Sequence, residues 1–151
     1  MWATVPIAPL RADMNLRMDV EQLRGLSPLD GISEAGLERV AACAAEVTRE
    51  AGQVLALPDD PGQGMYVIRE GTVAVELRSG TIELGPGDFF GELALLVEDG
   101  TRVARVRATT AVRCISIPRD DFLSLVESEP AFAVHLLREL ARRLVEARAA
   151  V

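Results

Sequence analysis

The middle of the chain is a series of short strand-like segments separated by turn residues. They cover residues 54–57, 65–68, 72–78, 81–84, 102–108 and 112–117. Apolar and polar residues alternate most clearly in residues 72–78, where Val73, Val75 and Leu77 share one face. Short strands at intervals of about 8 to 12 residues with glycine turns indicate a closed or double-sheet antiparallel barrel of the jelly-roll kind.

Helical patterns flank this region on both sides. Ser33 is a suitable N-cap and apolar residues follow it at helical spacing, so we expect a helix over residues 34–45, after a shorter one over 18–26. Beyond the strands, a short helix through Val126 precedes a longer one that Ser128 would cap. The apolar stripe of that last helix comprises Leu136, Leu137, Leu140, Ala141 and Leu144. The expected fold class is mainly β with flanking helices.

The length of 151 residues suits one domain with a core of its own. Residues 1–16 show no periodicity and are predicted to form an N-terminal tail. Residues 17–151 would form the single domain, with the jelly roll at about 47–118 and the C-terminal helices at about 119–149.

The composition excludes several classes of function. A net charge of −7 argues against a nucleic-acid partner, because affinity for DNA comes largely from Lys and Arg that neutralise phosphates. No apolar run approaches the roughly 18 to 20 residues that cross a bilayer, and no signal-peptide pattern is present, so we expect a cytoplasmic protein without a membrane partner. Cys43, Cys114 and His135 form no metal-ligand pattern, so no metal or cofactor is expected and the cysteines are predicted to be buried free thiols.

One arginine needs a partner that the strand pattern does not supply. In a strand over residues 102–108, Arg102 shares its face with Ala104, Val106 and Ala108 and would point toward the barrel interior. A guanidinium there stays protonated and needs an anion or several acceptors. Two partners fit: Glu92 of the preceding turn, in an ion pair that fixes the loop, or an anionic ligand such as a phosphate.

The residues before Arg102 also suit a phosphate. Residues 91–95 can form one tight helical turn with free backbone N–H groups, and Gly91 allows a ligand to approach the backbone closely. Glu92 would then accept hydrogen bonds from ligand hydroxyls. Together these features predict a sugar-phosphate site, with the Glu92–Arg102 ion pair as the alternative.

The same residues resemble a known motif. The run Gly-Asp-Phe-Phe-Gly-Glu-Leu-Ala-Leu-Leu from Gly87, followed by Arg-x-Ala-x-Val-Arg-Ala from Arg102, resembles the phosphate-binding cassette of cyclic nucleotide-binding domains. Such domains occur in the catabolite activator protein, cyclic-nucleotide-gated channels and cAMP-dependent kinase regulatory subunits. The likeness extends over about residues 29–144 and implies an eight-stranded jelly roll with helices before and after it.

The resemblance assigns roles to individual residues. It implies that Glu92 binds the ribose 2′-hydroxyl, that Arg102 binds the cyclic phosphate, and that backbone groups of neighbouring residues complete the site. The implied ligand-binding set is Phe90, Gly91, Glu92, Leu93, Ala94, Arg102, Val103, Ala104 and Arg143. Arg143 stands where activator-type members have an arginine that can pair with the cassette glutamate; the alternative is a solvated helix charge.

Two positions depart from the family pattern. The residue after the cassette arginine is often Ser or Thr, which helps to select guanine when it is Thr, whereas Val103 has no hydroxyl. A preference for cGMP by that route is therefore disfavoured. Activator-type members also carry a Thr-Ser pair that reaches the base from the last helix, where this chain has Ala147 and Arg148.

The leading hypothesis is a non-enzymatic, stand-alone cyclic nucleotide-binding regulatory module that senses cAMP and signals through its C-terminal helix. No helix-turn-helix domain follows that helix, which also disfavours a nucleic-acid partner. The stripe through Leu136, Leu140 and Leu144 would serve a homodimer or a protein partner, or would pack on the chain's own barrel. The alternative function is a degenerate domain that binds no nucleotide and acts as an interaction scaffold. A cupin-type metal enzyme is disfavoured because the chain lacks a ligand cluster.

Overall fold

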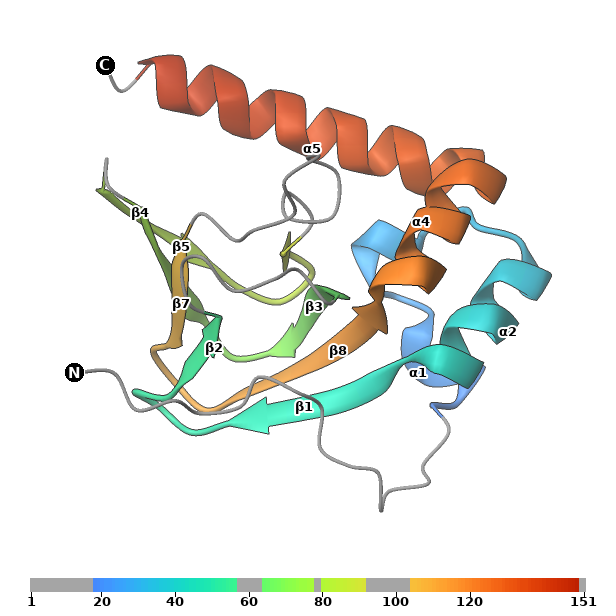
Figure 1. Ribbon diagram of the computed structural model, residues 1–151, viewed down its shortest axis with the longest axis horizontal. Helices are drawn as coiled ribbons and strands as arrows, with labels where there is room; N and C mark the ends of the chain where they lie inside the picture. The colour runs from blue at the N-terminus through green and yellow to red at the C-terminus, as the bar shows by residue number, and fades with distance from the viewer. Residues whose placement is uncertain (1–17, 57–63, 78–79, 92–103, 150–151) are drawn as a thin grey trace.

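A computed structural model of the chain describes residues 18–56, 64–77, 80–91 and 104–149. Two four-stranded antiparallel sheets form its centre, in the orders β1-β8-β3-β6 and β2-β7-β4-β5 (Figure 1). The strands are β1 Ala45–Arg49, β2 Val54–Ala56, β3 Gly64–Glu70, β4 Val73–Leu77, β5 Gly80–Leu84, β6 Phe89–Phe90, β7 Arg105–Ala108 and β8 Val112–Pro118. The predicted jelly-roll architecture, mainly β with flanking helices, is confirmed.

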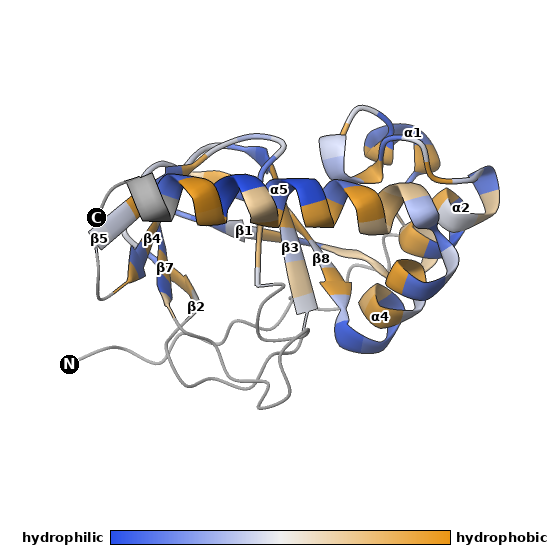
Figure 2. Cartoon of the chain, turned by 90° about the horizontal axis from the view of Figure 1, so that it is seen from above, coloured by the Kyte–Doolittle hydropathy of each residue, from blue (hydrophilic) through white to orange (hydrophobic). Residues whose placement is uncertain are grey.

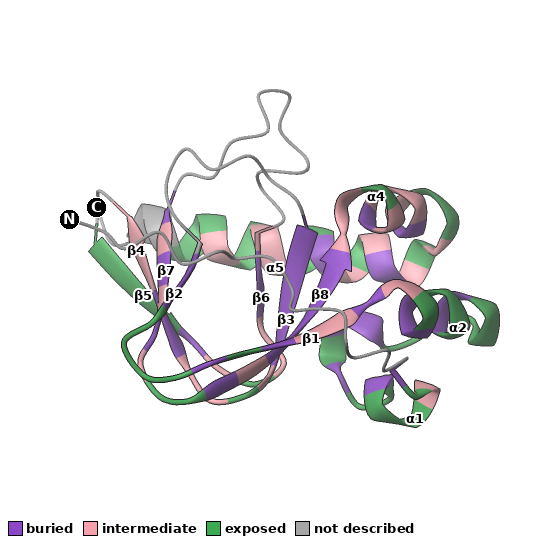
Figure 3. Ribbon diagram, turned by 60° about the horizontal axis from the view of Figure 1, so that its bottom comes forward, coloured by how far each residue is buried: buried purple, intermediate pink, exposed green. Residues whose placement is uncertain are grey.

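Strand β3 separates two apolar clusters. Met65 and Val67 belong to the cluster shared with the helices, whereas Tyr66 and Ile68 belong to the cluster between the two sheets. The period-2 geometry of a strand sends successive side chains to opposite faces, so both faces of β3 are buried. Figure 3 shows this burial along β3 and β8, in contrast to the exposed edge strand β5.

The helices pack on the outer face of the first sheet. They are α1 Val20–Leu23, η2 Ser27–Leu29 (a 3₁₀ helix), α2 Glu34–Cys43, α4 Arg119–Ser128 and α5 Pro130–Ala149. Phe122 of α4 and Phe132 of α5 meet edge to face, with ring centroids 5.9 Å apart, inside the cluster that β3 and β8 complete. Helix α5 extends from this group along the molecule (Figure 1).

Three local predictions differ from the structure. The helix expected over residues 18–26 is limited to Val20–Leu23, and the turn expected after it contains η2. Strand β1 follows α2 almost directly, where the helix was expected to continue to residue 45. Ala44 is extended and caps α2 through its backbone N–H to Val40 O, at 2.8 Å, because β1 must turn away to pair with β8.

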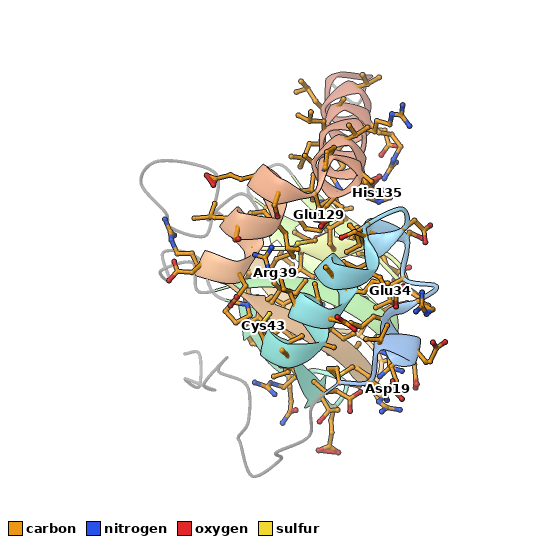
Figure 4. All side chains as sticks on the ribbon, turned by 90° about the vertical axis from the view of Figure 1, so that its right-hand side faces the viewer. Asp19, Glu34, Arg39, Cys43, Glu129 and His135 are labelled. Atoms are coloured by element: carbon orange, nitrogen blue, oxygen red, sulfur yellow. The ribbon has the colours of Figure 1, made fainter. Side chains whose placement is uncertain are left out.

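The junction between α4 and α5 is fastened to the start of α2. Ser128 was predicted to cap the last helix, but its hydroxyl donates to Ser124 O, 2.8 Å away, and Glu129 separates the two helices. The Glu129 carboxylate accepts hydrogen bonds from the Ser33 backbone N–H at 2.9 Å and from the Ser33 hydroxyl at 2.7 Å. Figure 4 shows Glu129 and Arg39 between α2 and the C-terminal helices. The Arg39 guanidinium donates hydrogen bonds to the hydroxyls of Ser124 and Ser128.

Replacing Glu129 with glutamine will lower the free energy of unfolding by about 1 kcal/mol at neutral pH, because a charged acceptor of two hydrogen bonds is lost. The Ser33 backbone N–H, and then its hydroxyl, lower the pKa of the Glu129 carboxyl. This stabilisation is therefore present above the ordinary pKa of 4.5 and is lost as the pH falls through the lower folded value.

Urea unfolding of both proteins at neutral pH and below pH 4 measures this difference. The difference in free energy of unfolding between the wild-type protein and Glu129→Gln should be smaller below pH 4 than at neutral pH. Glu127→Gln, which changes an exposed carboxylate of α4 two residues before Glu129, is the matched control and should leave stability unchanged at neutral pH. If Glu129→Gln lowers the free energy of unfolding by the same amount at both pH values, the hydrogen bonds from Ser33 to the ionised carboxylate are not the source of the stabilisation.

Candidate functional site

The predicted site residues divide into two groups in the structure. Phe90, Gly91, Ala104 and Arg143 are described, whereas Glu92, Leu93, Ala94, Arg102 and Val103 lie outside the described residues. The described residues fix where the cassette leaves the first sheet and where it enters the second. They also show which part of α5 lies against its start.

The turn before β6 is held by backbone hydrogen bonds to β3. Gly87 N donates to Ile68 O at 2.8 Å, and Ile68 N donates to Asp88 O at 2.9 Å. The Asp88 carboxylate accepts from Gly85 N at 2.9 Å, which closes the turn. The chain therefore enters β6 in a fixed register, with Phe90 paired to Tyr66.

The two phenylalanines of β6 point to opposite sides of the first sheet. Phe90 stacks on Tyr66 between the sheets, with ring centroids 5.0 Å apart, and Phe89 is buried under the helices. Gly91 follows with φ +93°, a left-handed conformation that side chains rarely adopt. That Gly91 lets a ligand approach the backbone closely stays a prediction.

Strand β7 forms the C-terminal end of the cassette. Val106 and Ala108 of β7 and Ala104, which directly precedes it, are all buried, so the described part of the inward-facing row predicted over residues 102–108 is confirmed. Arg105 and Arg107 instead pair with Glu76 of β4 on the outer face, and the Arg107 Nη2–Glu76 Oε2 distance is 3.2 Å. Arg102 has the spacing of the inward row, but it lies outside the described residues.

Arg143 fastens α5 to β6. Its Nη2 donates to Phe89 O at 2.8 Å, and its guanidinium carbon lies 4.6 Å from the centre of the Phe89 ring. Only 23% of its side chain is exposed, so the alternative of a solvated helix charge is wrong. Sequence reasoning missed Phe89 as the contact of Arg143, although the Phe-Phe pair before the cassette was visible. The start of the cassette and α5 are therefore in direct contact.

The apolar stripe of α5 is divided between two environments. Leu136 is buried in the domain core, whereas Leu144 is 60% exposed. The exposed apolar residues of α5 are Val134, Leu137, Leu144 and Val145. Figure 2 shows the resulting alternation of hydrophobic and hydrophilic bands along α5.

Neither thiol is activated. Burial raises the pKa of Cys43 to about 11 and that of Cys114 to about 12, and both cysteines are free. In the described part of the chain no group of three or more His, Cys, Asp or Glu side chains could hold a metal ion. None of the helices in that same part is long and apolar enough to cross a membrane.

Comparison with known proteins assigns the family. The sequence profile of the cyclic nucleotide-binding domain matches residues 46–129, more than half of the chain. The chain belongs to the cyclic nucleotide-binding domain family. The matched residues begin in β1 and end at Glu129, so they include both sheets and the whole cassette.

Individual relatives of this cyclic nucleotide-binding domain come from several kinds of protein. Glutaminase 2 of Bradyrhizobium diazoefficiens is 40% identical over 107 residues, which are 67% of this chain and 17% of that protein. A CRP-like cAMP-activated global transcriptional regulator of Mycobacterium tuberculosis is 35% identical over 100 residues, 62% of this chain and 44% of that protein. The chain thus spans less than half the length of these curated relatives.

The fold agrees with a solved member of the same group. The crystal structure of the Thermus thermophilus catabolite activator protein superposes with a TM-score of 0.69 at 28% sequence identity. The match covers 82% of this chain and 61% of that chain. The family is a regulatory ligand-binding domain, so its expected ligand is a cyclic nucleotide.

Proposed function

We propose that this domain is a non-enzymatic cytoplasmic sensor of cAMP that signals through α5. The observation that carries the proposal is the contact of Arg143 with Phe89, which joins α5 to the residue two positions before Gly91 of the cassette. A change at the cassette therefore has a direct structural path to the C-terminal helix. The proposed localisation rests on the sequence, in which we found no signal-peptide pattern and no apolar run of the length that crosses a bilayer.

The proposed site places each part of the nucleotide on a part of the cassette. Arg102 binds the cyclic phosphate with its planar guanidinium, which suits two-point contact. Glu92 accepts the hydrogen bond of the ribose 2′-hydroxyl. Backbone groups of Gly91, Leu93 and Ala94, and those of Val103 and Ala104, complete the phosphate site, and Phe90 and Arg143 border it.

The second sheet offers an apolar surface for the base. Val75, Ile82 and Val106 lie opposite one another in β4, β5 and β7 and so share one face. Val75 and Val106 belong to the cluster between the sheets, but Ile82 is 46% exposed. A purine ring placed there would cover exposed apolar area. The absence of a hydroxyl at Val103 favours adenine over guanine.

Signalling requires that the nucleotide bind one position of α5 better than another. Arg143 supplies the difference, since its cation–π contact and hydrogen bond hold only while α5 lies against β6. The nucleotide favours the position in which Arg143 holds α5 against the start of the cassette. That position of the helix is the one presented to a partner.

Calorimetric titration of the purified protein with cAMP and with cGMP tests the proposal. We expect saturable binding of cAMP and at least about tenfold weaker binding of cGMP, a difference of about 1.4 kcal/mol. Tighter binding of cGMP would contradict the proposed preference. Absence of heat and of any thermal shift with either nucleotide at millimolar concentration would reject the sensor and favour the interaction scaffold.

We further propose that the exposed face of α5 pairs with a second copy of the chain. Leu137 and Leu144 are seven residues apart, which is one heptad, and both are more than half exposed. Replacing both with glutamate should convert a dimer to a monomer in sedimentation experiments, because the apolar seam would become charged. Glu127→Gln on α4 is the control. A wild-type protein that is monomeric with and without cAMP would contradict the dimer.

A further inference from the structure

Glu139 lies one helical turn before Arg143 on α5 and faces it. Its Oε1 is 3.4 Å from Arg143 Nε, and only 18% of its side chain is exposed. The same carboxylate accepts hydrogen bonds from Arg142, including one from Nε to Oε2 at 3.1 Å. Glu139 is therefore a half-buried carboxylate that two adjacent arginines share.

The contacts of Arg143 are distributed around its guanidinium group. Nη2 meets Phe89 O, one face of the plane covers the Phe89 ring, and Nε faces Glu139. An arginine side chain has many rotamers, and ordering it costs conformational entropy. A fixed anion at the i−4 position reduces the number of orientations that compete with the one on Phe89.

We infer that Glu139 is a positioning residue for the proposed sensor: it orients Arg143 and so sets how firmly α5 is held at the start of the cassette. This inference rests on the proposed function. The described contacts of Glu139 are to Arg142 and Arg143, so it acts on the nucleotide site through Arg143. Hydrogen bonds from Arg142, followed by the charge of Arg143, lower the pKa of Glu139, which keeps the carboxylate ionised at neutral pH.

A purely structural role makes a different prediction. If Glu139 only stabilised α5 through surface ion pairs, its loss would resemble the loss of Glu146, which pairs with Arg142 one turn further along. Glu146 is 64% exposed and its described ion pair is with Arg142 alone, so Glu146→Gln is the matched control. The positioning role requires an effect of Glu139→Gln that Glu146→Gln lacks and that depends on Arg143.

The first measurement needs no nucleotide. In ¹⁵N spectra of arginine side chains, the Nε–H signal of Arg143 should be shifted and protected from solvent exchange in the wild-type protein. We expect Glu139→Gln to move this signal toward that of free arginine and to speed its exchange at least about fivefold, while Glu146→Gln leaves it unchanged. An unchanged Arg143 signal in Glu139→Gln would overturn the inference.

The second measurement is a double-mutant cycle on cAMP affinity. Glu139→Gln should weaken binding about fivefold in the wild-type background and have no effect in the Arg143→Ala background. An equal loss in both backgrounds would overturn the positioning role. If the wild-type protein binds no cyclic nucleotide, the proposed function fails, and the Nε–H measurement alone still decides whether Glu139 orients Arg143.

Discussion

Replacing Arg102 with glutamine will weaken cAMP binding by at least about 100-fold, because about 3 kcal/mol of charged hydrogen bonding to the cyclic phosphate is lost. Glutamine has one amide in place of the guanidinium fork and carries no charge, so it cannot make the same two-point contact. Calorimetric titration of the purified variant gives the affinity directly.

Arg105→Gln is the control for Arg102→Gln. Arg105 lies three residues further along and pairs with Glu76 on the outer face of the second sheet, so its loss removes an arginine without touching the proposed site. We expect cAMP affinity within about twofold of the wild-type value for this control. Equal losses in the two variants would show that a general charge effect, and no specific phosphate contact, determines binding.

Replacing Phe89 with alanine will lower the free energy of unfolding by about 3 to 5 kcal/mol, the usual range for deletion of a buried aromatic ring. Phe89 is 1% exposed, belongs to the cluster shared by β3, β8 and the helices, and has its ring beside His135 and Arg143 of α5. The change removes core packing and also the surface on which Arg143 rests. Urea unfolding measures the loss.

Two further variants separate these contributions. Phe89→Leu keeps most of the buried volume, so we expect a loss of about 1 to 2 kcal/mol, including the cation–π contact with Arg143. Ile82→Thr keeps a β-branched residue at an exposed position of β5 and should change stability by less than about 0.5 kcal/mol. A loss below about 1 kcal/mol for Phe89→Ala would contradict the burial of this ring.

The alternation of apolar residues was sufficient to predict most of the strands, because a half-buried strand imposes period 2 on its sequence. β4 is the clearest case, with Val73 and Val75 on the inner face as expected. β1 was missed, since its residues Ala45–Arg49 include few apolar side chains and follow a helix without a glycine or proline. Its pairing with β8 depends on residues more than sixty positions away, which local patterns do not contain.

The site was predicted less completely than the fold. The cassette spacing identified the family, and the inward row of β7 followed from periodicity. The environment of Arg143 could not be predicted from periodicity, because an arginine on an amphipathic helix has the same local sequence whether it is solvated or stacked on a ring. The contact between Phe89 and Arg143 joins residues 54 positions apart and appears only when α5 is placed over β6.

The link from Glu129 to Ser33 shows the same limit. Each residue has an ordinary local interpretation, an N-cap for Ser33 and a surface carboxylate for Glu129. Their hydrogen bonds span 96 positions of sequence and depend on how α4 and α2 pack on the first sheet. Gly36 makes room for this contact, since a Cβ there would lie 2.7 Å from the Glu129 carboxylate.

Amide hydrogen exchange with and without cAMP tests most directly whether nucleotide binding at the cassette is transmitted to α5. We predict slower exchange in β6 and altered exchange in α5 around Glu139 and Arg143 when cAMP is bound. Slower exchange in β6 with unchanged exchange in α5 would contradict signalling through the helix, and unchanged exchange in both elements would contradict nucleotide sensing itself.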